Sequence, residues 1–175
     1  MYAGHFASAL ILKTAKPEAP TWGLVAGAGL LDIGFGLLVA CGVEGLSPNW
    51  KTAHLLNIPW SHSLLTTLLL GGLFAALFRS RGRGVMLVMF AAVFSHWGLD
   101  VLVHRPDMEL WPHSTIKLGL FKVFGPVSGW AETLFVVVAT IIYALRARVS
   151  PTHGRHWAAM GALMAVFWGM GYVAG

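Results

Sequence analysis

The sequence predicts an all-α fold, a polytopic transmembrane helical bundle of about five membrane-spanning helices plus a short N-terminal half-span helix. The first observation is composition, since 57% of the 175 residues are hydrophobic and only 11% are charged, whereas soluble domains carry about 25% charged residues. The second is a series of apolar runs close to the roughly 20 residues that cross a hydrocarbon core. The third is the clustering of basic residues beside those runs, which is typical of orientation signals.

The elements are expected in the following order. Residues 2–12 are apolar apart from His5 and Ser8, and they are long enough only for a buried half-span or an interfacial helix. Longer apolar runs follow and are expected to span the membrane: residues 22–43, 60–78, 84–103, 129–145 and 157–173. No hydrophilic stretch is long enough to build a second core, so residues 1–175 are expected to form a single integral membrane domain.

Basic residues divide unequally between the two sides of this expected bundle. One side would hold Lys13, Lys16, Arg79, Arg81, Arg83, Arg146, Arg148 and Arg155, and the other would hold Lys51, Arg105, Lys117 and Lys122. The positive-inside rule assigns the richer side to the cytoplasm. We therefore expect the inner (cytoplasmic) membrane of a bacterium or archaeon, with the lipid bilayer as a partner. These clusters also explain the net charge of +5, so nucleic acid is not expected to bind.

Ionisable residues inside the apolar runs form a second pattern. Most of them lie toward the side opposite the basic clusters, so a site built from them would face the non-cytoplasmic side. Unpaired ionisable groups in hydrocarbon cost several kcal/mol, so these residues are expected to pair with one another or with an ion. They are His5, Asp32, His62, His96, Asp100 and Glu132.

The sharpest local motif is SHWGLD at residues 95–100. It places His96 and Asp100 four residues apart, on one face of a helix, where both can ligate one divalent ion. His5, Asp32 and His62 would complete a set of three imidazole nitrogens and two carboxylate oxygens. This mixture suits zinc first, with manganese or iron as alternatives. Such an ion would lower the pKa of a bound water molecule, which makes hydrolysis the expected chemistry.

Each of these residues also has a structural interpretation. His96 and Asp100 could be a hydrogen-bonded pair that ties helices together. His5 and His62 could be packing residues near an interface. Asp32 is harder to explain in this way, because a carboxylate in the middle of an apolar run needs a partner or a proton.

The order of these motifs resembles that of the YdjM-like inner-membrane proteins, which are described as membrane-bound metal-dependent hydrolases. The resemblance rests on His5, on Asp32 in LLDIG, on His62 in SHSLL, on SHWGLD, and on LWPHS at residues 110–114. The order of these motifs is also similar, more distantly, to the order in zinc-dependent phospholipases C and P1-type nucleases. The sequence departs from those enzymes at Ser128, where they have histidine, and at Pro59 and Trp60, where an arginine is expected.

The resemblance implies a metal site at His5, Asp32, His62, His96 and Asp100, and activated water attacking a phosphoester of a lipid or another membrane-associated substrate. Glu132 would be a further ligand or, like Asp107, a general base. Arg105 would hold an anionic phosphate.

Two other classes of function stay open. A non-catalytic accessory subunit could pack against other subunits of a larger membrane complex and keep a metal-site-like cluster. An ion or proton transport protein could use the same acidic and histidine residues as a relay, although the apolar runs carry few ionisable residues near the basic side.

Overall fold

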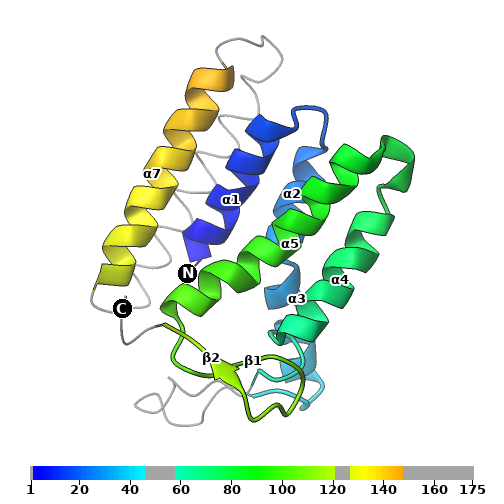
Figure 1. The fold of residues 1–175 in the computed structure, drawn as a ribbon, viewed down its shortest axis with the longest axis vertical. Helices are drawn as coiled ribbons and strands as arrows, with labels where there is room; N and C mark the ends of the chain where they lie inside the picture. The colour runs from blue at the N-terminus through cyan, green and yellow to red at the C-terminus, as the bar shows by residue number, and fades with distance from the viewer. Residues whose placement is uncertain (1, 46–57, 121–126, 148–175) are drawn as a thin grey trace.

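The structure is a computed structural model that describes residues 2–45, 58–120 and 127–147 (Figure 1). In chain order the elements are α1 (Tyr2–Ala15), α2 (Thr21–Ala28), α3 (Leu30–Ala40), α4 (Leu64–Ala76), the 3₁₀ turn η1 (Arg79–Arg81), α5 (Arg83–Val103), β1 (Met108–Glu109), β2 (Lys117–Leu118) and α7 (Ser128–Ala147). Helix α5 crosses the middle of the bundle, with α4 on one side of it and α1 and α7 on the other. The described part of the chain is therefore mostly helical.

Local sequence explains where several helices begin and end. Ser63 caps the start of α4, because its hydroxyl accepts a hydrogen bond from the Thr66 N–H at 3.2 Å. Gly82 lies between η1 and α5 with φ of 89°, a conformation that favours glycine. Helices α2 and α3 meet at Gly29, where the chain bends by 50°.

Close contact between α2 and α5 depends on glycine. A Cβ atom at Gly23 would lie 3.1 Å from the Sδ of Met89, and one at Gly27 would lie 3.1 Å from the Cβ of Ala92. Facing them on α5, Met89 and Ala92 are fully buried. Small residues on α2 thus allow the two helices to approach closely, which brings the end of α2 near the middle of α5.

Helix α1 lies inside the bundle. It packs against α7, α2 and α5. Its Ala7 and Leu10 form a buried cluster with Ala139 and Tyr143 of α7. The expected half-span or interfacial helix is therefore a 14-residue core helix, and its burial brings His5 beside α5.

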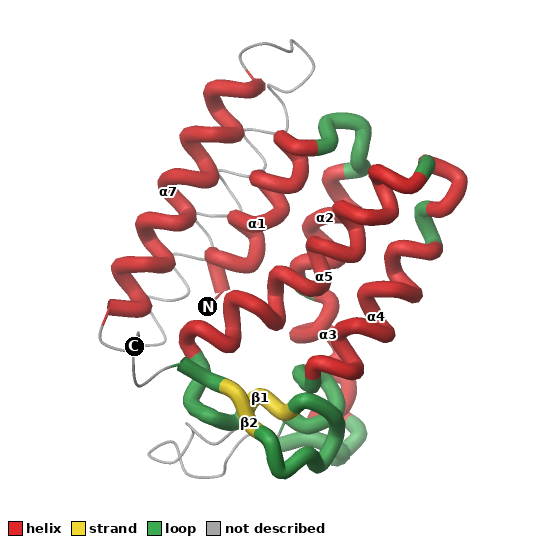
Figure 2. The backbone as a smooth tube through the Cα atoms, in the orientation of Figure 1, coloured by secondary structure: helices red, strands yellow, loops and turns green. Residues whose placement is uncertain are grey.

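A short hairpin closes the end of the bundle at which α5 stops. Strands β1 and β2 pair antiparallel, with Met108 opposite Leu118, and Figure 2 shows them beneath the helices. Met108 is fully buried and packs in a cluster with Trp97. Gly119 has φ of 154°, and a Cβ atom there would overlap the carbonyl of Arg105, so glycine is required for the hairpin to fold back against the end of α5.

The expected five-span bundle is wrong. Within the ranges that the structure describes, α5 is the one helix long and apolar enough to cross a membrane, and α2 and α3 pass the same test only as a bent pair. Residues 22–43 were expected to form one span, but they are interrupted at Gly29. Residues 60–78 begin with a turn, so α4 has only 13 residues. The expected span at residues 157–173 lies outside the described residues.

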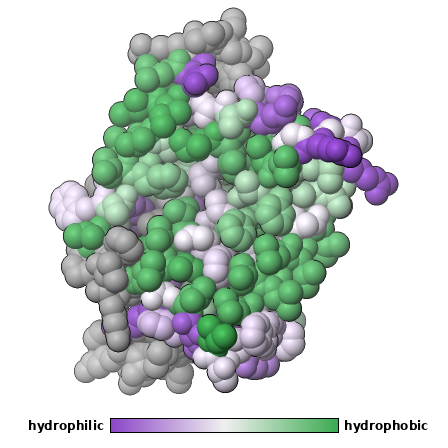
Figure 3. Space-filling model, in the orientation of Figure 1, coloured by the Kyte–Doolittle hydropathy of each residue, from purple (hydrophilic) through white to green (hydrophobic). Residues whose placement is uncertain are grey.

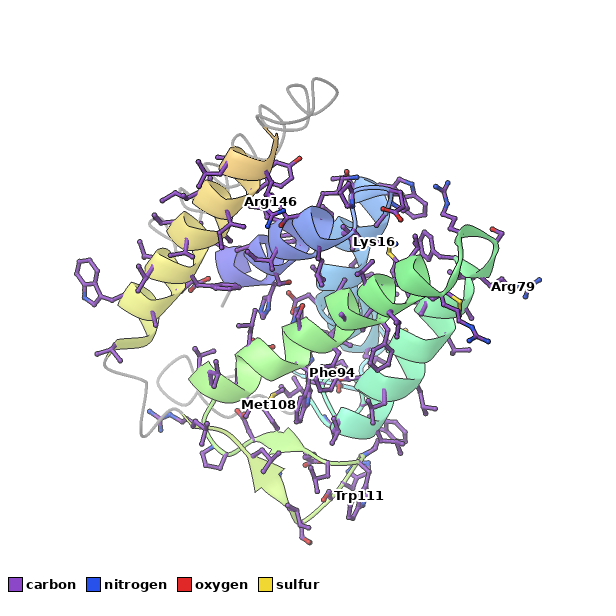
Figure 4. The ribbon with its side chains drawn as sticks, turned by 45° about the horizontal axis from the view of Figure 1, so that its top comes forward. Lys16, Arg79, Phe94, Met108, Trp111 and Arg146 are labelled. Carbon is purple, nitrogen blue, oxygen red and sulfur yellow. The ribbon has the colours of Figure 1, made fainter. Side chains whose placement is uncertain are left out.

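The expected location is corrected with the fold. One such helix is weak support for membrane insertion, because the core helix of a soluble protein passes the same test. An integral membrane protein of the inner membrane is therefore not supported, and the orientation assigned from basic residues loses its basis. Of the basic residues labelled in Figure 4, Lys16, Arg79 and Arg146 lie away from the hairpin end that carries Met108 and Trp111.

Many large hydrophobic side chains remain at the surface. Hydrophobic residues cover much of the face drawn in Figure 3. On α4, Leu69 and Leu73 are 58% and 68% exposed, and on α7, Leu134 is 65% exposed. The high hydropathy of the sequence thus reflects surface residues as well as the core.

Candidate metal centre

The structure brings together the five side chains that the sequence predicts as metal ligands. His5 comes from α1, Asp32 from the first turn of α3, His62 from the turn before α4, and His96 and Asp100 from α5. They fall into two overlapping groups that could hold a metal ion, one of His5, His96 and Asp100 and one of Asp32, His62 and His96. The side chains of His5, His62, His96 and Asp100 are buried, whereas that of Asp32 is 43% exposed and opens the cluster to solvent.

Four ligand atoms in this cluster have the spacing of a metal coordination shell. His96 Nε2 lies 3.2 Å from Asp100 Oδ2 and 3.5 Å from Asp32 Oδ1. His62 Nε2 lies 3.6 Å from the same Asp32 oxygen and 3.7 Å from the same Asp100 oxygen. Ligands bound to zinc at its usual bond lengths in a tetrahedron are about 3.4 Å apart. These four distances are close to that spacing, and they join two ligand groups that share His96.

The hydrogen bond to the other ring nitrogen of His96 leaves Nε2 available as a ligand. His96 Nδ1–H donates to the carbonyl of Ala28 at 2.6 Å. Ala28 is the last residue of α2, where carbonyl groups lack partners within the helix. The ring is completely buried, and in the described part of the chain Nε2 has no hydrogen-bond partner. A buried nitrogen without a partner that faces two carboxylates is the arrangement expected of a metal ligand.

His62 is oriented in a similar way. The hydroxyl of Ser61 lies 2.7 Å from His62 Nδ1. When Nδ1–H donates to this hydroxyl, Nε2 carries the free lone pair and faces Asp32 and Asp100. Because Nδ1 of His62 is held by a hydroxyl and Nδ1 of His96 by a carbonyl, both rings are oriented with Nε2 toward the two carboxylates.

Asp100 presents its two oxygens to different sides of the cluster. Oδ2 faces His62 and His96, whereas Oδ1 lies 3.1 Å from His5 Nε2. The His5 and His96 rings are stacked, with centroids 3.7 Å apart and planes 5° from parallel. On the far side of Oδ1, His104 Nε2 lies 4.0 Å away.

The carboxylates and imidazoles stabilise one another's charge. Burial alone would disfavour the imidazolium of His96, but the nearby carboxylates of Asp100 and Asp32 outweigh it and raise its pKa to about 9. Burial would likewise raise the pKa values of Asp100 and Asp32, yet the neighbouring histidines hold both pKa values well below the usual range. For His5, burial prevails and lowers the pKa. The cluster therefore favours ionised carboxylates and a cation between them.

The three residues predicted to assist catalysis occupy different places. Glu132 Oε1 accepts a hydrogen bond from the Gly4 N–H at 2.9 Å, so it caps the start of α1 next to His5 and belongs to neither ligand group. Asp107 Oδ1 lies 3.1 Å from His104 Nδ1, one side chain away from the cluster. Arg105 is exposed in the turn after α5.

His104 is the residue that the sequence analysis missed. Its ring lies between two carboxylates: His104 Nδ1 contacts Asp107, and His104 Nε2 lies near Asp100. A signal was present in the sequence, because Asp100 and His104 repeat the four-residue spacing of His96 and Asp100 and so continue the same helical face.

Comparison with protein-family models, with curated proteins and with solved structures found no match for this chain. The site must therefore be interpreted from its own geometry and chemistry.

Proposed function

We propose that this chain is a metal-dependent hydrolase that cleaves a phosphoester with an activated water molecule. The observation that carries the proposal is the buried Nε2 atom of His96, which forms no hydrogen bond of good geometry among the described residues and faces the carboxylates of Asp32 and Asp100 at 3.5 and 3.2 Å. Two further ligand-type side chains, those of His5 and His62, converge on the same point, which a simple hydrogen-bonded pair of His96 and Asp100 would not require. Two imidazoles with two carboxylates favour zinc, with manganese or iron as alternatives.

The roles of the protein side chains follow from their positions. Asp32, His62, His96 and Asp100 would hold the ion, and the ion would supply a Lewis acid and a nucleophile derived from water near neutral pH. Because Asp32 is partly exposed, substrate would approach from its side of the cluster. His5 would either donate a hydrogen bond to Asp100 or bind the ion beside it. In both cases it would keep that carboxylate turned toward the other ligands.

Proton transfer and phosphate binding would come from the segment after α5. His104 lies closer to the cluster than Asp107 does, and Asp107 orients its ring through Nδ1. The general base expected at Asp107 is therefore proposed to be His104, with Asp107 as its orienting partner. Arg105, exposed beside this pair, is proposed to bind the anionic phosphate. Glu132 is proposed to be a helix cap that positions His5, not a base.

Metal content is the direct test. Elemental analysis of the purified chain is expected to find zinc, manganese or iron, and the double variant His96→Ala, Asp100→Ala is expected to lose it. His113→Ala is the matched control, because His113 is an exposed histidine of the hairpin loop outside both ligand groups. The metal-loaded chain is then assayed on a chromogenic phosphodiester and phosphomonoester.

The outcomes separate the alternatives. Metal lost in the double variant, together with phosphoester cleavage that falls in parallel, would support the hydrolase. Metal without cleavage of any phosphoester would refute the proposed chemistry while keeping the metal site. A chain that holds no metal even after loading would leave a polar packing cluster, and a non-catalytic accessory role would then be the better interpretation.

A further inference from the structure

The turn that carries His62 is held by a buried carboxylate that lies outside the metal centre. Glu44 is only 5% exposed. Its Oε1 accepts hydrogen bonds from the backbone N–H of Trp60 at 2.8 Å and of Ser61 at 2.9 Å. Its Oε2 is also buried and has no hydrogen-bond partner among the described residues. Burying a carboxylate for two backbone groups is costly, so a role beyond filling space is indicated.

The two backbone groups that Glu44 binds precede His62 directly. Ser61, whose N–H Glu44 accepts, places its hydroxyl 2.7 Å from His62 Nδ1. After the His62 side chain, the backbone carbonyl of His62 accepts a hydrogen bond from Trp97 Nε1 at 2.9 Å. The backbone of His62 is thus fixed from both directions. Its Nε2 then points toward Asp32 and Asp100.

Glu44 also connects this turn to the helix that supplies Asp32. The N–H groups of Val43 and Glu44 both donate to the Leu38 carbonyl, at 2.9 and 3.2 Å, which anchors Glu44 to the end of α3. Asp32 lies in the first turn of that helix. Glu44 therefore joins the segment that carries Asp32 to the segment that carries His62. Its hydrogen bond to Ser61 spans 17 positions in the sequence.

We propose that Glu44 is a positioning residue for the metal centre, acting through Ser61 to fix the orientation of the His62 ring. The inference rests on the proposed function, because it concerns the geometry of a metal ligand. With Glu44 in place, the Ser61 hydroxyl stays within hydrogen-bond distance of His62 Nδ1, so the ring is held with Nε2 toward Asp32 and Asp100. Loss of a partner that orients a ligand typically lowers metal affinity by about 10- to 100-fold.

The experiment titrates Co²⁺ into the chelator-treated full chain and records both affinity and the visible absorption of the bound ion. Glu44→Gln and Ser61→Ala are expected to weaken Co²⁺ binding by about 10- to 100-fold and to change the absorption spectrum. Glu109→Gln is the matched control for the first variant, since Glu109 is 7% exposed, pairs with Lys117 and belongs to neither ligand group. Ser114→Ala is the control for the second, because Ser114 is 3% exposed and bonds the backbone of the hairpin loop. Both controls should bind Co²⁺ like the wild type.

Wild-type affinity and spectrum in Glu44→Gln and Ser61→Ala would overturn this inference while leaving the proposed metal site intact. Failure of the wild type to bind Co²⁺ would instead refute the proposed function, and this inference with it. Circular dichroism checks that each variant folds. If Glu44→Gln does not, Ser61→Ala still tests the link through the Ser61 hydroxyl, and wild-type binding in that variant would overturn the inference.

Discussion

Replacement of Asp100 by Asn should weaken metal binding by about a hundredfold. Asp100 Oδ2 lies 3.2 Å from His96 Nε2 and 3.7 Å from His62 Nε2, close to the spacing of ligands that share one ion. Four-ligand zinc sites bind with about 10–16 kcal/mol, so an equal share for one ligand is about 3 kcal/mol. At about 1.4 kcal/mol for each factor of ten, this share corresponds to about a hundredfold in Kd. The amide keeps an oxygen but removes the negative charge.

The assay is a competition titration of Zn²⁺ between the protein and a chelator of known affinity, performed on the wild type, on Asp100→Asn and on Glu109→Gln. Glu109→Gln makes the same chemical change at another buried carboxylate and should leave Kd unchanged. A Kd for Asp100→Asn equal to that of Glu109→Gln would refute the assignment of Asp100 as a ligand.

Three further predictions concern stability and pH. Met89→Ala, in the fully buried centre of α5, should lower the free energy of unfolding by about 2–5 kcal/mol through the cavity that it leaves, measured by denaturant titration. Gly27→Val should lower the free energy of unfolding by about 1–3 kcal/mol, because α2 and α5 must separate. Gly72→Ala on α4 adds a Cβ atom that meets nothing within 4 Å, so it should raise that free energy by up to about 1 kcal/mol. Equal melting temperatures for these two variants would contradict the packing. In chelator-treated protein the pKa of His96 is about 9, above its ordinary value of 6.5. The stabilisation it contributes should therefore be complete below pH 6.5 and lost as pH rises through 9, and a His96→Gln variant should lack this decline.

Local spacing made part of the site predictable. His96 and Asp100 share a helical face because residues four apart lie one above the other, and α5 matches its expected range closely. The convergence of His5, Asp32 and His62 on that face could only be expected from their chemistry. It depends on contacts between helices that are distant in sequence, such as the close packing of α2 on α5 at Gly27.

Hydropathy does not distinguish the interior and surface residues of a bundle from lipid-facing ones, so the five spans predicted from it were wrong. The run at residues 22–43 has no polar interruption except Asp32, so nothing in its composition marks the bend at Gly29. Asp107 and Glu132 were expected to act at the site because of their charge, but their hydrogen bonds to His104 and Gly4 place them one step away from it. These bonds depend on the turn after α5 and on the packing of α7 against α1, which sequence periodicity does not encode.

The bend at Gly29 links the shape of the fold to occupancy of the site. Ala28, before the bend, accepts the hydrogen bond of His96, and Asp32, after it, faces the same ring. An ion held between His96 and Asp32 would join the two arms of the bend to α5. By thermodynamic reciprocity, any partner or mutation that straightens α2 and α3 must weaken ion binding by the same factor by which the ion resists straightening.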